Sequence, residues 1–458
     1  MKQDRKNALF IGIGVLALVG SIQFNLSRVS ALQETEDSDD LASLTNSSVD
    51  RSTELGKPLT SDKKSEKEFD ILLADPAMSQ KWDLTMTQTK EAWVKHRAVG
   101  SRDIKVCVID TGIDAKHPDI KENLWVNKGE TGKDDKGRNK STNNIDDDNN
   151  GFVDDVHGFN FVENNSDLSD HHGHGTHIAG AIGAVGGNGI GVSGIAAQVS
   201  LIIAKYYDPK SNANNNLVNT IRSIRYCIAV GANIINYSGG GLEPSDKERE
   251  AIAQARDSGI LFVAAAGNER SDSDVKKYYP ADYDLDNIIS VTAIDREKNV
   301  LPSSNYGVKS VDIAAPGKNI YSTLPGGTYG FMTGTSQATA VVTGVATLLK
   351  ARFPDFDASR IIRHITETGD LEPTKLSGKT KNQKRLNAYR ALAILDQGVN
   401  VTGAVPTNSA SIDTKEFAAG SRDLSNDSSS VTLAPGGLGD FSDDLRKFLD
   451  EKRAQRTP

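Results

Sequence analysis

The sequence predicts an α/β fold: a doubly wound, mostly parallel sheet with helices on both of its faces. Short, nearly continuous apolar runs recur along the middle of the chain, as in strands that a parallel sheet buries on both faces. Segments with a helical pattern separate these runs. Strands that alternate with helices favour a parallel sheet, because a crossover must return the chain to the starting end of the next strand. The 458 residues allow one large domain with extensions, or two domains.

The elements expected from these patterns follow one another in a regular order. The predicted strands span residues 104–109, 201–204, 234–236, 261–266 and 288–293, and the predicted helices span residues 217–229, 246–258 and 338–349. Ligands of a doubly wound sheet bind beyond the carboxyl ends of its strands. Asp110 and Asn268 each follow the end of a predicted strand, so we expect functional side chains at this edge.

The two ends of the chain differ in composition from this middle part. Residues 1–31 are typical of a secretory signal, with basic residues before a short apolar run and small residues at a possible cleavage site after Ala31. The expected location is therefore secreted or periplasmic, and the chain contacts a membrane only if this segment stays uncleaved as an anchor. Residues 32–72 are polar and acidic and predict a disordered linker or a short pro-segment. Residues 396–458 predict a flexible polar tail with a possible terminal helix.

The composition argues against one class of partner and leaves the state of the two cysteines open. Apolar residues make up 37% and charged residues 25% of the chain, as in ordinary soluble globular proteins. A net charge of −8 and an isoelectric point near 5.6 argue against nucleic acid as the main partner. We interpret Cys107 and Cys227 as small buried hydrophobic residues, with a disulfide between them as the alternative.

Four short motifs supply the chemistry. They read VIDTG at 108–112, HGTH at 174–177, AAGN at 265–268 and GTSQA at 334–338. Together they contain a carboxylate, an imidazole, an amide donor and a hydroxyl, which are the groups that acyl transfer needs. Their order along the chain is Asp, His, Ser, whereas α/β-hydrolases run Ser, Asp, His and chymotrypsin-like enzymes run His, Asp, Ser.

With these motifs in this order, the chain resembles the subtilisin family of serine endopeptidases (subtilases, peptidase S8) over roughly residues 75–395. The resemblance implies a subtilisin-like catalytic domain at residues 73–395. It also implies hydrolysis of peptide bonds through an acyl-enzyme, by a monomer that acts on a protein or peptide substrate. Two alternatives stay open: a membrane-anchored processing protease, and a non-catalytic binding module that kept the fold.

The resemblance assigns a role to one residue in each motif. Ser336 is the nucleophile, His174 the general base, and Asp110 the residue that orients the imidazole. Asn268 donates to the oxyanion, together with the backbone N–H of Ser336. A competing hypothesis is a zinc site, because three histidines recur at every third position, His171, His174 and His177. Zinc peptidases of the His-Glu-x-x-His type place a Glu beside the first ligand, and this stretch contains none.

Two segments resemble the family's binding pocket for the residue that precedes the scissile bond. The first, NYSGGG at 236–241, follows a predicted strand and forms one wall in subtilases. It includes the expected substrate contacts Ser238, Gly239 and Gly240, and its glycines predict open walls. The second, YYPA at 278–281, resembles the pocket's floor, which Tyr278 would partly fill.

Two calcium sites are expected, with a structural role. Asp146, Asp148, Asn150 and Asp154 place oxygen donors at spacings that suit a hard cation, although the Glu that closes an EF-hand loop is missing. A solvated acidic loop is the alternative. The second site follows from the resemblance alone, which implies a match to the family's strong calcium site. Its expected ligands are the side chains of Asp75, Asp119 and Asn188 and the carbonyls of Gly186, Ile190 and Val192.

Overall fold

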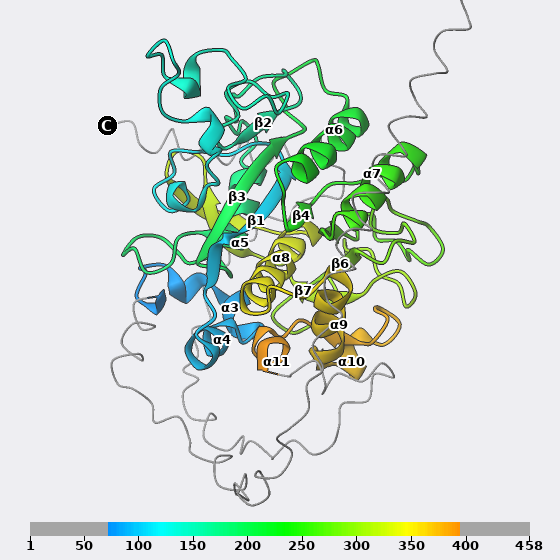
Figure 1. Cartoon of the computed structure of the whole chain (residues 1–458). Helices are drawn as coiled ribbons and strands as arrows, with labels where there is room; N and C mark the ends of the chain where they lie inside the picture. The colour runs from blue at the N-terminus through cyan, green and yellow to red at the C-terminus, as the bar shows by residue number, and fades with distance from the viewer. Residues whose placement is uncertain (1–71, 394–458) are drawn as a thin grey trace, which may run out of the picture. The chain divides into compact units, whose positions relative to one another are not determined.

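Figure 1 presents a computed structural model of the protein, which describes residues 72–393. The signal predicted for residues 1–31, the linker up to residue 71 and the tail predicted for residues 396–458 lie outside the described residues. Between residues 72 and 393, no helix is both long enough and apolar enough to cross a membrane.

The predicted sheet is confirmed. In the part of the chain that the structure describes, nine strands form one sheet in the order β10-β11-β7-β6-β5-β4-β1-β3-β2. All neighbouring pairs are parallel except β10 with β11. The strands are β1 Gly100–Asp110, β2 Gly158–Asn160, β3 Gln198–Lys205, β4 Ile234–Tyr237, β5 Leu261–Ala265, β6 Ile288–Ile294, β7 Ile313–Pro316, β10 Asp370–Leu371 and β11 Lys384–Arg385. A separate antiparallel hairpin joins β8 (Ile320–Leu324) to β9 (Thr328–Met332).

Helices cover both faces of this sheet, as predicted (Figure 1). The α-helices are α3 Trp82–Met86, α4 Thr89–His96, α5 His174–Gly183, α6 Asn216–Ala229, α7 Asp246–Asp257, α8 Thr335–Arg352, α9 Ala358–Thr368, α10 Pro373–Leu376 and α11 Ala388–Ala393. Short 3-10 helices are η1 Met78–Gln80, η2 Lys121–Asn123, η3 Lys128–Glu130 and η4 Lys140–Thr142.

Successive side chains of β1 point to two different hydrophobic cores, because side chains alternate between the faces of a strand. Val106 and Val108 belong to the core that α5, α8 and α9 complete. Cys107 and Ile109 belong to the core that α6 and α7 complete. This double burial explains why the strand appears in the sequence as an unbroken apolar run.

The chain changes direction across the sheet at β1, which lies between β3 and β4. From β1 the chain forms β2 and then β3 on one side, and then crosses to add β4 on the other. In doubly wound sheets, such a switch point leaves a crevice beyond the carboxyl ends of the strands. Asp110 is the last residue of β1, so it lies at this crevice.

The preferred interpretation of the cysteines as separate buried thiols is wrong. Cys107 of β1 and Cys227 of α6 form a disulfide, with 5.9 Å between their Cα atoms. Both residues are fully buried. Their pairing depends on how α6 lies across one face of the sheet, and spacing in the sequence does not encode that. The bond fastens α6 to the strand that ends at Asp110.

We predict that the oxidised protein has no reactive thiol even when it is denatured. Replacing both cysteines by alanine should lower the free energy of unfolding by about 2–5 kcal/mol, because the bond closes a long loop in the unfolded chain. Urea unfolding of the two proteins measures the difference. Thiol labelling of the denatured, unreduced protein is the direct check, and two labelled cysteines would contradict the pairing.

Candidate active site

Asp110 and His174 form a buried hydrogen-bonded pair at the end of β1. His174 is the first residue of α5, and its Nδ1 lies 2.7 Å from Asp110 Oδ1. The two residues are only 2% and 4% exposed, respectively. The backbone N–H of Thr111 donates to the same carboxylate oxygen at 2.8 Å. Because an ionised carboxylate only accepts, the proton in this bond belongs to Nδ1, and Nε2 points away from Asp110.

The surroundings of His174 favour its protonated form. Burial by itself lowers the pKa of the imidazole, but the charge of Asp110 and the hydrogen bond to it raise this pKa. The charge of Asp170 adds to the rise, and the result lies above the ordinary value of 6.5. The site therefore stabilises an imidazolium, which is the species that forms when a general base takes a proton.

Asp170, which sequence reasoning missed, fastens the start of α5 to the end of β1. It is buried, and one of its carboxylate oxygens accepts from the hydroxyl of Thr111 and from the N–H of Gly173, at 2.9 and 2.7 Å. The other oxygen accepts from the N–H and hydroxyl of Thr176, at 2.8 and 2.7 Å. Both partner threonines stand in the recognised motifs, but nothing in the local sequence distinguishes Asp170 from a loop aspartate.

Ser336 is the second residue of α8, as its position in the GTSQA motif suggested. Its Oγ donates to the backbone carbonyl of Ser238 at 3.0 Å. The hydroxyl of Ser238 donates in return to the carbonyl of Ser336, at 3.3 Å. Since Ser238 directly follows β4, which pairs in parallel with β1, the helix start that carries Ser336 lies at the same end of the sheet as the Asp110–His174 pair.

The side-chain amide of Asn268 has a defined orientation. Its Oδ1 accepts from the backbone N–H and the hydroxyl of Thr335, at 3.1 and 3.2 Å. A backbone N–H can only donate, so the atom that faces it must be the amide oxygen. The amide N–H₂ group of Asn268 therefore points away from Thr335. Asn268 follows β5 and is partly exposed.

Two of the three glycines of segment 236–241, Gly239 and Gly240, do not leave the open walls that the sequence predicted, whereas nothing lies within 4 Å of a Cβ built on Gly241. An added Cβ at Gly240 would lie 2.5 Å from a ring carbon of Tyr278, and one at Gly239 would lie 2.5 Å from the hydroxyl of Tyr206. Side chains already fill the space beside these glycines. The expectation of open walls is therefore wrong, because the absence of a side chain here accommodates a neighbouring tyrosine.

The three histidines of the zinc hypothesis have three different partners. His174 is hydrogen-bonded to Asp110, whereas His171 Nδ1 lies 2.8 Å from a carboxylate oxygen of Asp208. His177 Nε2 lies 2.9 Å from the carbonyl of Ile320. Burial, followed by the charge of His174, lowers the pKa of His177 to about 3. This arrangement does not favour a site shared by the three rings.

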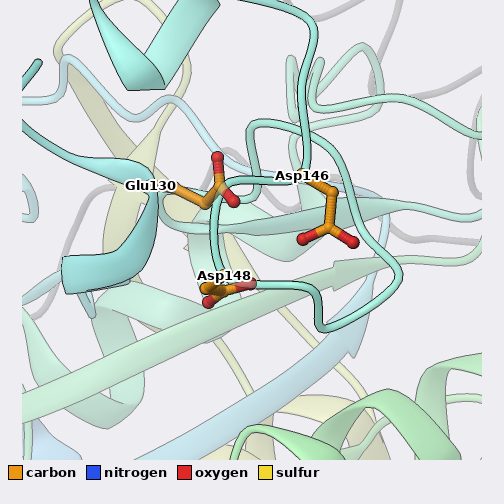
Figure 2. A group of neighbouring side chains, drawn as sticks. All are labelled: Glu130, Asp146 and Asp148. Atoms are coloured by element: carbon orange, nitrogen blue, oxygen red, sulfur yellow. The ribbon is translucent and has the colours of Figure 1, made fainter. Parts of the chain in front are cut away.

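Part of the acidic loop predicted to bind calcium converges on one point. Figure 2 shows Glu130, Asp146 and Asp148, which can each direct one carboxylate oxygen to within 4.8 Å of the others. Glu130 is fully buried, and its Oε2 has no hydrogen-bond partner. Burial raises the pKa of Glu130. The hydrogen bond from the Asp147 N–H lowers this pKa, the charges of the neighbouring aspartates raise it further, and the result lies above the ordinary value.

Glu130 is the glutamate that joins the two aspartates of this cluster. The loop lacks a glutamate at its own end, and Glu130 reaches the cluster from η3, upstream in the sequence. Sequence reasoning missed it because the EF-hand pattern places that ligand after the aspartates.

The other two predicted ligands of this loop lie differently from the prediction. The side-chain N–H₂ of Asn150 donates to Asp148 and Asp155, at 3.4 and 3.1 Å, and its oxygen accepts from the N–H of Phe152. In this arrangement the N–H₂ group of Asn150 faces these carboxylates, and its oxygen is already hydrogen-bonded to Phe152. Asp154 is buried, with one oxygen bound to the N–H of Asn144 and the other without a partner. It stands outside the converging group of three carboxylates.

The residues predicted for the second calcium site lie together around the loop 186–192. Asp119 accepts from the Asn188 side chain at 2.7 Å and from the N–H of Val192 at 2.9 Å. Asp75 accepts from two backbone N–H groups of the same loop, at 2.8 and 2.9 Å. Burial raises the pKa of Asp119 to about 6, and the charge of Asp75 adds to the effect. The hydroxyl of Tyr329, which the sequence did not suggest, also donates to Asp119.

The chain is similar to several known proteases. It is 34% identical to "Subtilisin-like protease 1" of Plasmodium berghei (strain Anka), over 63% of this chain and 49% of that protein. The protein of the same name from Plasmodium falciparum (isolate 3D7) is also 34% identical, over 71% of this chain and 48% of the relative. This chain thus spans about half the length of these relatives. "Major intracellular serine protease" of Bacillus subtilis (strain 168) is 34% identical, over 58% of this chain and 74% of that protein.

A solved structure supports the fold alone. It is that of a protease from Pseudoalteromonas arctica, and it superposes with a TM-score of 0.55, at 24% sequence identity. The match covers 70% of this chain and 98% of that one. The model of the subtilase family matches residues 101–391, which include all four motifs. The chain therefore belongs to the subtilase family of serine proteases.

Proposed function

We propose that this protein is a serine endopeptidase that hydrolyses peptide bonds through an acyl-enzyme, with Asp110, His174 and Ser336 as its triad. The observation that carries the proposal is the buried hydrogen bond of 2.7 Å between Asp110 and His174. It lies at the edge of the sheet where doubly wound folds bind their ligands. A binding module has no need of an imidazole whose pKa is raised by a buried carboxylate.

The reaction needs one rearrangement of the Ser336 hydroxyl. Its hydrogen bond to Ser238 must give way, so that the proton passes to Nε2 of His174 as Oγ attacks the peptide carbonyl. The imidazolium then donates this proton to the leaving amine, and a water molecule repeats the sequence to release the acid. Asp110 keeps the ring oriented and stabilises its charge throughout.

Asn268 supplies a donor for the charge that develops on the carbonyl oxygen. Because its amide oxygen is held by Thr335, its N–H₂ group is oriented before the substrate arrives, and a preoriented donor stabilises the transition state without further reorganisation. The N–H of Ser336 in the first turn of α8 acts with it, since the first N–H groups of a helix have no partner inside the helix.

The substrate is a protein or peptide, and the chain acts outside the cytoplasm as a secreted or periplasmic monomer. The signal-like residues 1–31 support this location. If the segment is not cleaved, the same enzyme is a membrane-anchored processing protease. The mass of the mature protein's N-terminus distinguishes the two.

We predict that a fluorophosphonate probe labels the protein at Ser336 and abolishes peptide hydrolysis. Ser336→Ala should lose both labelling and turnover while its unfolding curve stays close to that of the wild type, since the hydroxyl contributes one hydrogen bond, to Ser238. Peptide mapping identifies the labelled residue. A label on another serine, or a Ser336→Ala variant that retains its turnover, would refute the assignment.

The activity should depend on pH through His174. A base must be neutral, and the folded-state pKa of His174 is raised above 6.5, so kcat/KM should fall as the pH drops through that raised value. Initial rates measured between pH 5 and 9 give the profile. His171→Ala serves as the control, because His171 binds Asp208 instead. The pH profile of His171→Ala should match that of the wild type. A shift of this profile relative to the wild type would mean that the wrong histidine was assigned.

We also propose that calcium binds the carboxylates of Glu130, Asp146 and Asp148, and a second calcium the group of Asp75, Asp119 and Asn188. An unpartnered, fully buried carboxylate oxygen on Glu130 supports the first site, because a buried charge without a partner is costly. Oxygen ligands of this kind suit a hard cation. When bound, calcium neutralises the mutual repulsion of these carboxylates. The side chains themselves tie η3 to the loop at residues 146–148.

Calcium should raise the melting temperature, because a ligand that binds only the folded state adds about 2.7 kcal/mol of stability at a concentration of 100 times its dissociation constant. Glu130→Gln should reduce this shift, whereas Glu122→Gln, at an exposed carboxylate elsewhere, should retain it. Asp75→Asn tests the second site separately. Identical melting curves in calcium and in EGTA for the wild type would refute both sites.

A further inference from the structure

We call the substrate residue whose carbonyl is attacked the acyl residue. The proposed chemistry defines where the side chain of this residue must lie. That carbonyl carbon lies at Ser336 Oγ, and its oxygen faces Asn268. Ser336 is hydrogen-bonded to Ser238, the start of segment 238–240. Asn268 directly follows segment 265–267, the end of β5 and its extension. The side chain therefore enters between these two segments, in a space that we call the acyl slot.

The ring of Tyr278 occupies the far end of the acyl slot. A Cβ on Gly240 would lie 2.5 Å from Tyr278 Cε1, and a Cβ on Gly267 would lie 2.9 Å from Tyr278 Cδ2. Cε1 and Cδ2 are opposite corners of the same ring, so the ring spans the space between the two glycines. Each contact is shorter than a real Cβ could accept; at Gly267, the positive φ of 100° and the nearer Glu269 and Asn305 side chains also favour glycine.

The backbone around Tyr278 is held from two directions. Its backbone N–H donates to Asp282 Oδ2 at 2.7 Å, and its carbonyl accepts from the N–H of Asp282 at 3.0 Å. The next residue, Tyr279, exchanges two backbone hydrogen bonds with Gly241, at 2.7 and 2.8 Å. These bonds tie the floor segment to the wall segment. The point from which the ring extends is therefore fixed, and in this structure the ring lies between Gly240 and Gly267.

The rest of the slot offers little compensation for a large or charged side chain. The hydroxyl of Tyr206 lies beside Gly239, on the same wall. The carboxylate of Glu269, beside Gly267, already accepts from the side-chain N–H₂ of Asn305 at 2.7 Å. This hydrogen bond occupies Oε2, the oxygen of Glu269 that lies beside Gly267.

We infer that Tyr278 shortens the acyl slot, so that this enzyme cleaves after residues with small side chains, such as glycine, alanine and serine. Large apolar residues such as phenylalanine meet the ring and are disfavoured. This inference rests on the proposed function, because it takes the position of the slot from the roles of Ser336 and Asn268. It adds the substrate class, which the motifs do not contain.

The test is a set of succinyl-Ala-Ala-Pro-X p-nitroanilides in which X is alanine, phenylalanine or arginine. For the wild type, kcat/KM should be highest for alanine. Tyr278→Ala should raise kcat/KM for phenylalanine by roughly 10–100-fold, the range that one or two extra carbon atoms in a pocket can produce. Tyr278→Phe keeps the ring and should leave the order unchanged. Tyr389→Phe is the matched control, because the Tyr389 ring lies in α11, where it stacks on His96.

A wild-type preference for phenylalanine or arginine overturns the inference, and this result does not depend on how well Tyr278→Ala folds. An unchanged preference in a folded Tyr278→Ala also overturns it. Fluorophosphonate labelling of Ser336 in the same samples separates the two levels of argument. If Ser336 is fully labelled and the enzyme prefers large residues, only the inference of a short slot is refuted. If Ser336 is not labelled, the proposed function is refuted, and the inference that rests on it is refuted as well.

Discussion

The hydrogen bond between Asp110 and His174 constrains everything around it, because it requires a carboxylate to be almost completely buried. An ionised carboxylate out of water is costly unless donors and an opposite charge replace its hydration. Here the Thr111 N–H and the imidazole are the replacements. Thr111 is in turn held by Asp170, which also holds the first turn of α5. The geometry of the Asp110–His174 pair is thus a consequence of where β1 ends and where α5 begins.

A second buried polar chain fixes the other half of the site. Helix α8 is buried from Thr335 to Leu349, so its hydroxyl groups must find partners inside the protein. Thr343 donates to the amide oxygen of Asn236 at 2.8 Å, and the amide nitrogen of Asn236 donates to Ser238 at 3.1 Å. Ser238 then binds Ser336 in both directions. Ser336 is therefore connected to the middle of its own helix through β4.

The sequence was sufficient for whatever is local or periodic. The predicted strands at 104–109 and 261–266 and the helix at 217–229 appear within a few residues of their expected ends, because double burial leaves an apolar run and a surface helix leaves a 3.6-residue pattern. Asp110 and His174 were found through the order of the motifs. Features that depend on distant packing were not found. The disulfide requires α6 to lie across β1, and Glu130 reaches the acidic cluster from an earlier segment.

Glycine illustrates why the missing part cannot be derived from residue types. A glycine in a predicted pocket wall is consistent with an open pocket. It is equally consistent with a neighbouring side chain that fills the space, and which of the two applies depends on a residue distant in the sequence. Gly240 and Gly267 meet the same Tyr278 ring from opposite sides. No pattern in either segment refers to residue 278, since the three positions come together only when β4, β5 and the floor segment are assembled. The resemblance already placed Tyr278 at the floor of the pocket, but that its ring lies between Gly240 and Gly267 follows from packing that the motifs do not encode.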